Sequence, residues 1–270
     1  MNTKSRNAII TGAAGLLGKK HAEALLERGF RVILVDNNYK ELVKVKKSLN
    51  VFFSDSKIII FNADITKENK IIKLKKFLKK RKINVDTLIN NAAINPKMSN
   101  LNKSSSGKLE NYKIKSLVKE IEVGIVGAFV CTKVFGADMA KNKFGVIINM
   151  GSDLSIIAPD QAVYHKSDNI EKVKHFKPAG YSITKFGLLG LTKYVGTYWA
   201  HRGIRCNMLV AGGVENKQPS FLIKNIKKRI PMNRWARADE YKKAIQFLCS
   251  EDSKYMTGQT LVIDGGRTAW

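Results

Sequence analysis

The 270-residue sequence predicts an α/β fold in a single domain spanning residues 1–270, with a doubly wound parallel sheet and helices on both faces. Short, continuous apolar runs alternate with stretches of helical spacing, and no Pro-, Ser- or Gly-rich linker divides the chain. Strands that are apolar at every position are buried on both faces, which is typical of parallel sheets between helical layers. The hydrophobic share of 44% is enough for a substantial core.

The first strand is expected over residues 8–11, and the helix that follows it is expected to end at Gly29. Six further strands are expected at the apolar runs 31–36, 57–64, 85–93, 145–152, 204–213 and 260–266. The segments between most of these runs have the apolar periodicity of helices. The polar stretch 95–113 is expected to form a loop.

The formal net charge is +26, and most of the positive residues are lysines spread along the chain. The densest run, 73–82, has apolar residues at helical spacing and is therefore interpreted as a surface helix with a solvated basic face. No aromatic RNA-binding motif, zinc-finger spacing or basic-zipper pattern is present, so nucleic acid is not an expected partner. A positive field of this kind suits the attraction of anionic small substrates.

The cysteines, Cys131, Cys206 and Cys249, are widely separated and odd in number, which favours reduced thiols over a disulfide framework. The four histidines are scattered and no ligand spacing for a metal occurs, so we expect no metal. The N-terminus lacks the apolar core of a signal peptide, and no apolar run approaches the length of a membrane span. We therefore expect a cytoplasmic protein without a membrane partner.

The turn TGAAGLLG after the first strand places Gly12, Gly15 and Gly18 at intervals of three. Glycine permits a tight turn and a close approach of the backbone to a pyrophosphate, and the following helix N-terminus offers free N–H groups. Asp36 ends the second strand, 21 residues after Gly15, where an acid binds the adenosine ribose. That carboxylate favours NAD over NADP, although Lys40 nearby leaves NADP open. The alternative is a strand-to-helix turn without a ligand.

The segment GYSITKFG places Tyr181 and Lys185 four residues apart, so the phenol and the ammonium share one helix face. Taken alone, this spacing also fits a lysine whose stem packs beside a half-buried tyrosine. Ser152 ends the fifth expected strand and, taken alone, is equally well explained as a turn residue.

Together these segments resemble the short-chain dehydrogenase/reductase family in its one-domain branch. The resemblance rests on the glycine turn, NADI, NNAA, NMGS, YSITK, RCNMLVAGG and MTGQTLVIDGG, in that order along nearly the whole chain. It implies a Rossmann-like fold with a seven-stranded sheet, one nicotinamide dinucleotide, and a homodimer or homotetramer. It also implies that Tyr181 is the general acid/base, that Lys185 holds the nicotinamide ribose, and that Ser152 hydrogen-bonds the substrate oxygen. Lys185 and the cationic nicotinamide are expected to lower the pKa of Tyr181.

The resemblance also implies which residues contact the cofactor. Asn90 is expected beside the adenine end, with Asp64. The full set of expected cofactor-binding residues is Gly12, Ala14, Gly15, Leu16, Leu17, Asp36, Asp64, Ile65, Asn91, Ala92, Ala93, Tyr181, Lys185, Gly213 and Val214.

Two positions depart from the family pattern. Gly124 stands where the family carries a fourth catalytic residue, an asparagine whose main-chain carbonyl anchors a water that leads to the lysine. Glycine keeps that carbonyl and tolerates an irregular helix, so a weakened relay is expected. Ala211 replaces a frequent proline and is expected to loosen its loop slightly.

Tyr181 follows Ser152 by 29 positions, a longer connection than in typical one-domain relatives. The inserted segment is polar and is expected to form a substrate lid, with an oligomer contact or a solvated loop as the alternative. Resemblance to oxidoreductases of bacterial surface-sugar pathways, including flagellin modification, implies alcohol/ketone interconversion on a sugar or sugar nucleotide. The alternatives are a sugar-nucleotide epimerase or dehydratase that recycles its cofactor, and a non-catalytic dinucleotide-binding protein. Arg234 and Arg237 are candidates for a phosphate contact or for surface ion pairs.

Overall fold

A computed structural model describes residues 6–95, 107–165 and 176–270; parts of the predicted loop (96–106) and lid (166–175) lie outside the described residues. Seven parallel strands form one sheet in the order β3-β2-β1-β4-β5-β6-β7. The strand order reverses between β1 and β4, which is where doubly wound sheets open a ligand crevice. The strands are β1 Asn7–Thr11, β2 Arg31–Asp36, β3 Ile58–Asn62, β4 Thr87–Asn90, β5 Gly145–Ser152, β6 Ile204–Ala211 and β7 Thr260–Ile263. The predicted fold class is confirmed.

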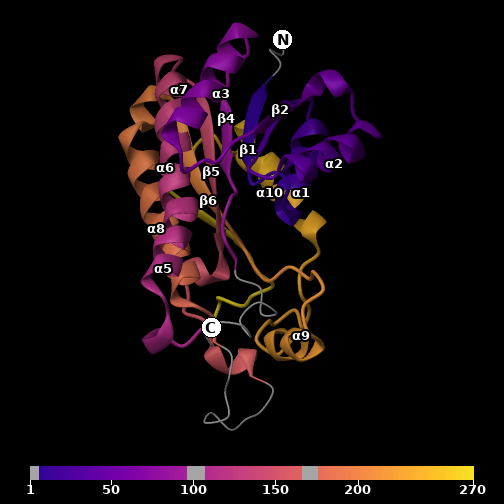
Figure 1. Ribbon diagram of the computed structural model, residues 1–270, viewed down its shortest axis with the longest axis vertical. Helices are drawn as coiled ribbons and strands as arrows, with labels where there is room; N and C mark the ends of the chain where they lie inside the picture. Colours follow the sequence, from indigo (N-terminus) through magenta and orange to yellow (C-terminus); the bar gives the residue numbers. More distant parts are fainter. Residues whose placement is uncertain (1–5, 96–106, 166–175) are drawn as a thin grey trace.

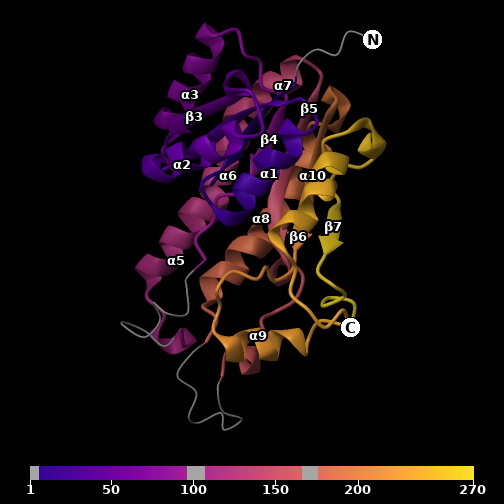
Figure 2. The ribbon, with the colours of Figure 1, turned by 90° about the vertical axis from the view of Figure 1, so that its right-hand side faces the viewer.

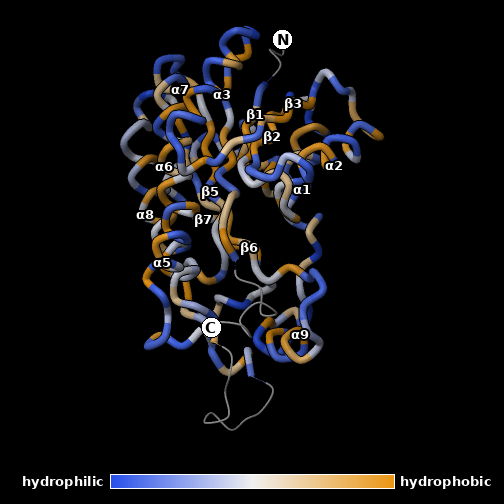
Figure 3. Tube along the Cα trace, viewed as in Figure 1, coloured by the Kyte–Doolittle hydropathy of each residue, from blue (hydrophilic) through white to orange (hydrophobic). Residues whose placement is uncertain are grey.

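Helices cover both faces of the sheet (Figure 1). One layer consists of α1 (Leu16–Leu26), α2 (Tyr39–Asn50) and α10 (Lys242–Leu248). The other contains α3 (Glu68–Lys80), α6 (Gly127–Cys131), α7 (Ala137–Lys141) and α8 (Ala179–Tyr198). Along β1, Ala8 and Ile10 pack on the first layer and Ile9 on the second. This alternation explains why the strand is apolar at every position, and Figure 3 shows the apolar strands between the two layers.

The helix from Ile114 to Lys141 combines α5 (Ile114–Ile121), α6 and α7 with two π-helical turns, Glu122–Val126 and Thr132–Gly136. Length and composition alone would allow it to cross a membrane, contrary to the expectation that no segment approaches a span. Within the protein, however, 61% of its most apolar stretch is buried. It packs against α3, α8 and the sheet as a core helix does.

The carboxyl ends of the strands point toward α9 (Ser220–Lys227), which lies at the opposite end of the molecule from α3 and α7 (Figure 2). A small apolar cluster there joins α9 to Tyr164 and Trp235. Short 3₁₀ turns complete the described chain at Asp55–Lys57, Leu109–Asn111, Asp153–Ser155, Gln161–Tyr164, Ala200–Arg202, Ala238–Tyr241 and Glu251–Ser253.

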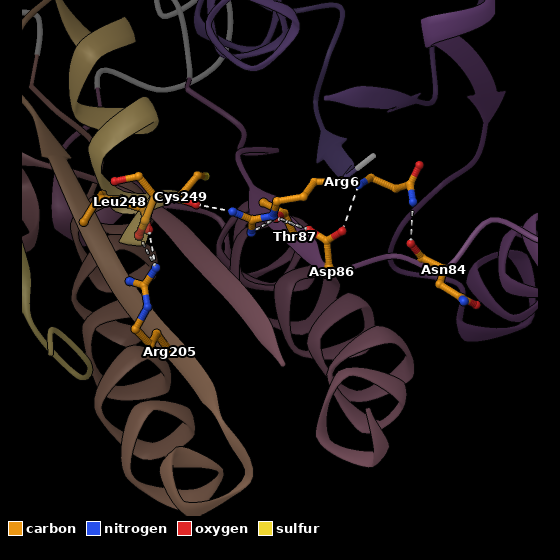
Figure 4. Close-up of polar contacts among 9 residues, drawn as sticks. Arg6, Asn84, Asp86, Thr87, Arg205, Leu248 and Cys249 are labelled. Atoms are coloured by element: carbon orange, nitrogen blue, oxygen red, sulfur yellow. Dashed lines mark hydrogen bonds and ion pairs between the residues drawn. The ribbon is translucent and has the colours of Figure 1, made fainter. Parts of the chain in front are cut away.

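Two arginines tie the amino-terminal edge of the sheet to the end of α10 (Figure 4). Arg6 forms an ion pair of 3.0 Å with Asp86 and donates to the carbonyl of Cys249. Arg205 donates to the carbonyl of Leu248 at 3.0 Å. Carbonyls at a helix C-terminus lack intrahelical partners, so these contacts satisfy them and fix α10 against the sheet.

Candidate active site

The turn between β1 and α1 has backbone angles and close contacts that only glycine accommodates. Gly12 has φ +61°, and a Cβ there would lie 2.7 Å from the Cα of Ala92. A Cβ on Gly18 would lie 2.3 Å from the Gly12 carbonyl oxygen. Gly15 is the N-cap of α1, with no side-chain cap and no acidic residue in the first turn. The amides of Leu16 and Leu17 at this terminus therefore suit an anion such as a pyrophosphate.

The segment that follows β4 holds the glycine turn in place through hydrogen bonds. The Asn91 side chain donates to the carbonyls of Thr11 and Gly12, at 3.0 Å each. The Thr11 hydroxyl accepts from the backbone of Asn91 and Ala92 at 3.0 and 3.2 Å. Ala93 follows as an exposed residue. Asn91 and Ala92 therefore hold the crevice between β1 and β4 in shape.

Two acids stand where the strands end. Asp36 accepts from the backbone of Ala14 and of Asn38, at 3.0 Å each, so its carboxylate lies beside the glycine turn. Asp64 accepts from Thr66 after β3. The next residue, Ile65, is 6% exposed and packs on Gly127 of the opposite helix.

The loop after β6 forms the far wall of the crevice. Gly213 lies against the ring of Trp235, and Val214 pairs with Ala236 in an isolated parallel bridge. The carbonyl of Gly213 accepts from the Ala236 amide at 3.0 Å. The glycine turn, the Asp36 carboxylate and this loop together fit a dinucleotide.

Ser152, Tyr181 and Lys185 meet at the carboxyl end of β5. Ser152 ends that strand, 8% exposed, and its hydroxyl lies near enough to Tyr181, in the first turn of α8, to influence the pKa of the phenol. The Lys185 ammonium lies 5.7 Å from the Tyr181 ring centroid and donates to the Met150 carbonyl at 2.6 Å. A phenol, a hydroxyl and an ammonium thus converge, as the sequence predicts.

The electrostatics of the tyrosine differ from the expectation. Burial raises the pKa of Tyr181 to about 12; the nearby Ser152 hydroxyl lowers it and Asp153 raises it further. Burial, together with repulsion by Lys177, lowers the pKa of Lys185 to about 8. The expected lowering of the Tyr181 pKa is therefore wrong for the protein alone, because desolvation outweighs the nearby ammonium.

A buried ion pair that was not predicted from the sequence lies next to Ser152. Ser152 Oγ donates to Asp153 Oδ1 at 2.6 Å, and Asp153 Oδ2 lies 2.9 Å from Arg267 Nε. The Asp153 and Arg267 side chains are only 9% and 5% exposed. The Nε–H of Arg267 is not aligned for a hydrogen bond, so the contact is electrostatic. The pair fixes the hydroxyl of Ser152, and only its position directly after Ser152 could have singled out Asp153.

A second missed residue is Lys177, which lies before α8. Its ammonium is 4.0 Å from the Tyr181 ring centroid and donates to Asn95 Oδ1 at 2.6 Å. Its position in the long Ser152–Tyr181 segment was the only sequence signal for it.

Asn90 is not beside the adenine end of the crevice, as expected, but inside the core. Its side chain is 3% exposed and donates to Asn149 Oδ1 at 2.9 Å and to Thr132 at 3.1 Å. Asn149 in turn donates to Thr192 of α8. Because Asn91 faces the glycine turn and side chains alternate along a strand, Asn90 must face the opposite way.

Gly124 lies in the π-helical turn Glu122–Val126, so the irregular helix expected at this place is present. A Cβ on Gly124 would lie 2.1 Å from Cγ2 of Thr184. The Thr184 methyl group therefore occupies the space that an asparagine side chain would need. Glycine and threonine therefore fit each other at this place.

Three other predictions concern side chains away from the crevice. Arg234 pairs with Glu240 at 2.6 Å and Arg237 with Asp239 at 3.3 Å, in favour of the surface ion-pair alternative. The three cysteines are buried and free. Within residues 6–95, 107–165 and 176–270, no three His, Cys, Asp or Glu side chains gather as a metal site would require.

Comparison with known proteins supports a dinucleotide-dependent oxidoreductase class. A family model described as enoyl-(acyl carrier protein) reductase matches residues 12–268. An NAD-dependent glycerol dehydrogenase of Listeria innocua is 28% identical, over 99% of this chain and 95% of that protein. A gluconate 5-dehydrogenase of Burkholderia cenocepacia, solved with NADP and tartrate, has a TM-score of 0.83 and 25% identity, covering 98% of this chain and 96% of that one.

A short-chain type dehydrogenase/reductase of Sinorhizobium fredii is 26% identical over 97% of this chain, which spans only 43% of that longer protein. The chain belongs to the short-chain dehydrogenase/reductase family. It is an NAD(P)-dependent oxidoreductase that acts on CH–OH groups.

Proposed function

We propose that the protein interconverts a secondary alcohol and a ketone on a hydroxylated, sugar-like small molecule, with NAD as the preferred cofactor. The observation that carries the proposal is the convergence of Ser152, Tyr181 and Lys185 at the carboxyl end of β5. Relatives that act on glycerol and gluconate support a polyhydroxylated substrate.

Tyr181 is the proton donor and acceptor of this proposal. With a pKa near 12 it is a neutral phenol at physiological pH, which suits it to give a proton to a carbonyl oxygen during ketone reduction. Alcohol oxidation needs the phenolate, which the Lys185 ammonium and a bound cationic nicotinamide both favour. The nicotinamide supplies or accepts the hydride when it is bound.

Ser152 is proposed to hydrogen-bond the substrate oxygen and stabilise the charge that develops on it. Its hydroxyl donates to Asp153 in the protein alone, so the bound oxygen must compete with that carboxylate for the proton. Arg267 weakens the competition, because its positive charge is paired with the same carboxylate.

The cofactor contacts are proposed along the crevice. The α1 amides at Leu16 and Leu17 face the pyrophosphate, and Asp36 holds the adenosine ribose. A carboxylate at Asp36 repels a 2′-phosphate, which supports NAD over NADP. Lys40 is exposed nearby and is the residue that would weaken this preference.

We also propose that the protein forms a homodimer through α5, α6 and α8. Exposed apolar side chains lie on these neighbouring helices, and contiguous apolar patches often mark protein–protein contacts. They are Ile114, Val118, Val126, Phe129, Ile183, Phe186, Tyr194 and Tyr198. A second copy of the same face would cover them around a two-fold axis. Light scattering should give twice the chain mass at micromolar concentration, and a monomer would contradict the proposal.

The experiment that tests the function combines binding and turnover. Each of NAD(H) and NADP(H) is tested for thermal stabilisation, and polyols, sugars and sugar nucleotides are then tested for reduction of the bound dinucleotide. We expect NADH to raise the melting temperature more than NADPH, because a ligand that binds only the folded state stabilises it. If neither dinucleotide stabilises the protein and no probe is oxidised or reduced, the proposal is wrong.

A further inference from the structure

Lys177 is held rigidly at the mouth of the candidate active site. Its backbone N–H donates to Gln161 Oε1 at 2.8 Å, and Gln161 Nε2 donates back to the Lys177 carbonyl at 3.2 Å. Its ammonium lies 4.0 Å from the Tyr181 ring centroid. A lysine whose backbone is fixed on both sides loses less freedom on binding a ligand than one on an open loop.

The Lys177 ammonium lacks a counter-ion among the described residues. No carboxylate there lies within 4.0 Å of it, and its hydrogen-bond acceptor is the neutral amide of Asn95. Asp153 and Glu120 act on it only from beyond that distance, and Asp153 is paired with Arg267. Burial lowers the pKa of Lys177 to about 8, because the two distant carboxylates offset only part of the loss of hydration.

The Lys185 ammonium adds a second positive charge beside Tyr181. Lys177 also lowers the pKa of Lys185, so the two ammonium groups beside Tyr181 repel each other. An anion bound in this region would relieve the repulsion and satisfy the donor that Asn95 holds in the protein alone.

We propose that Lys177 recognises an anionic group of the substrate, so that the substrate is a polyhydroxylated compound with a carboxylate or phosphate close to its reacting carbon. The inference rests on the proposed function, because it places this group beside the tyrosine that handles the substrate proton. Lys177 is then a specificity-determining residue. Carboxylate and phosphate share the chemistry that the ammonium recognises, and the test separates them.

The test measures binding and turnover of three matched probes by the NADH- or NAD-loaded protein: glucitol, gluconate and glucitol phosphate. We expect one of the two anions to bind about 10- to 100-fold more tightly than glucitol, the range for a charge-assisted contact. Lys177→Met should remove that preference and change KM far more than kcat. Lys193→Met, at an exposed lysine of α8, is the matched control and should keep the preference.

Each outcome decides the inference separately from the proposed function. An anion preference that vanishes in Lys177→Met supports the inference even if none of the probes is turned over. Turnover of glucitol as efficient as that of both anions keeps the function and overturns the inference. A preference that survives Lys177→Met, or no binding of either anion, also overturns it.

Discussion

The close fit between Gly124 and Thr184 makes a quantitative prediction. A Cβ at position 124 would lie 2.1 Å from Thr184 Cγ2, against the roughly 3.5–4.0 Å at which two carbons attract. Overpacking of this kind costs about 1–3 kcal/mol of stability. Alanine regains about 1 kcal/mol over glycine in a helix. Gly124→Ala alone should therefore destabilise the protein by about 0–2 kcal/mol.

Removing the threonine methyl group should reverse the sign. In a Thr184→Ser background the remaining atoms, Cβ and Oγ, would lie 3.5 and 3.8 Å from the new methyl group, which are ordinary contacts. Gly124→Ala should then stabilise the protein by about 1 kcal/mol. The coupling energy between the two positions, measured by urea unfolding of all four proteins, should be about 1–3 kcal/mol.

Additive effects of the two substitutions would refute this reasoning, because they would show that the two side chains do not compete for one space.

The same double-mutant comparison determines how the missing asparagine should be tested. Gly124→Asn alone strains the helix, so its activity would report on strain as well as on the proton relay. Gly124→Asn combined with Thr184→Ser offers the side chain room and tests the relay itself.

Three further predictions concern charge. Arg267→Met should cost about 3–5 kcal/mol in urea unfolding, since it strands a buried carboxylate; Asp153→Asn in the same chain should recover most of the loss, and no recovery would contradict the pairing. Burial lowers the pKa of His21 from 6.5 to about 3, so below pH 6.5 the unfolded chain binds a proton that the folded one does not, and stability falls by about 2 kcal/mol at pH 5. His21→Gln should reduce the fall of the unfolding free energy below pH 6.5. An unchanged pH dependence would show that groups other than His21 cause the fall. Asp36→Ser should weaken NADH binding about 10-fold or more and bring the dissociation constants of NADH and NADPH closer together, as measured by titration. An unchanged ratio of the two dissociation constants would show that Asp36 does not contact the ribose.

The fold was predictable because its signal is local. The central strands β1, β4, β5 and β6 bury both faces, so their residues are largely apolar without alternation, and the seven predicted runs coincide with the seven strands. Glycine positions were equally informative, because φ +61° at Gly12 admits few other residues. The spacing of Tyr181 and Lys185 on one helix face needed only the period of the helix.

What escaped prediction depends on contacts between distant segments. Arg267 reaches Asp153 from the end of the chain, and no pattern around either residue announces the pair. Thr184 fills the space beside Gly124 only because α8 packs on the π-helical turn. The pKa of Tyr181 was wrongly expected to fall, since the sequence names the neighbouring ammonium but not the degree of burial.

The most direct test of Tyr181 as the proton donor and acceptor removes its phenol oxygen in Tyr181→Phe. Tyr164→Phe, at a nearby buried tyrosine, is the matched control. Steady-state turnover and NADH affinity are measured together on the best substrate from the panel. We expect Tyr181→Phe to lower kcat by about 10²- to 10⁴-fold with an almost unchanged NADH affinity, while Tyr164→Phe keeps most of the activity. Turnover by Tyr181→Phe within a few-fold of the parent would contradict the claim that this phenol carries the substrate proton.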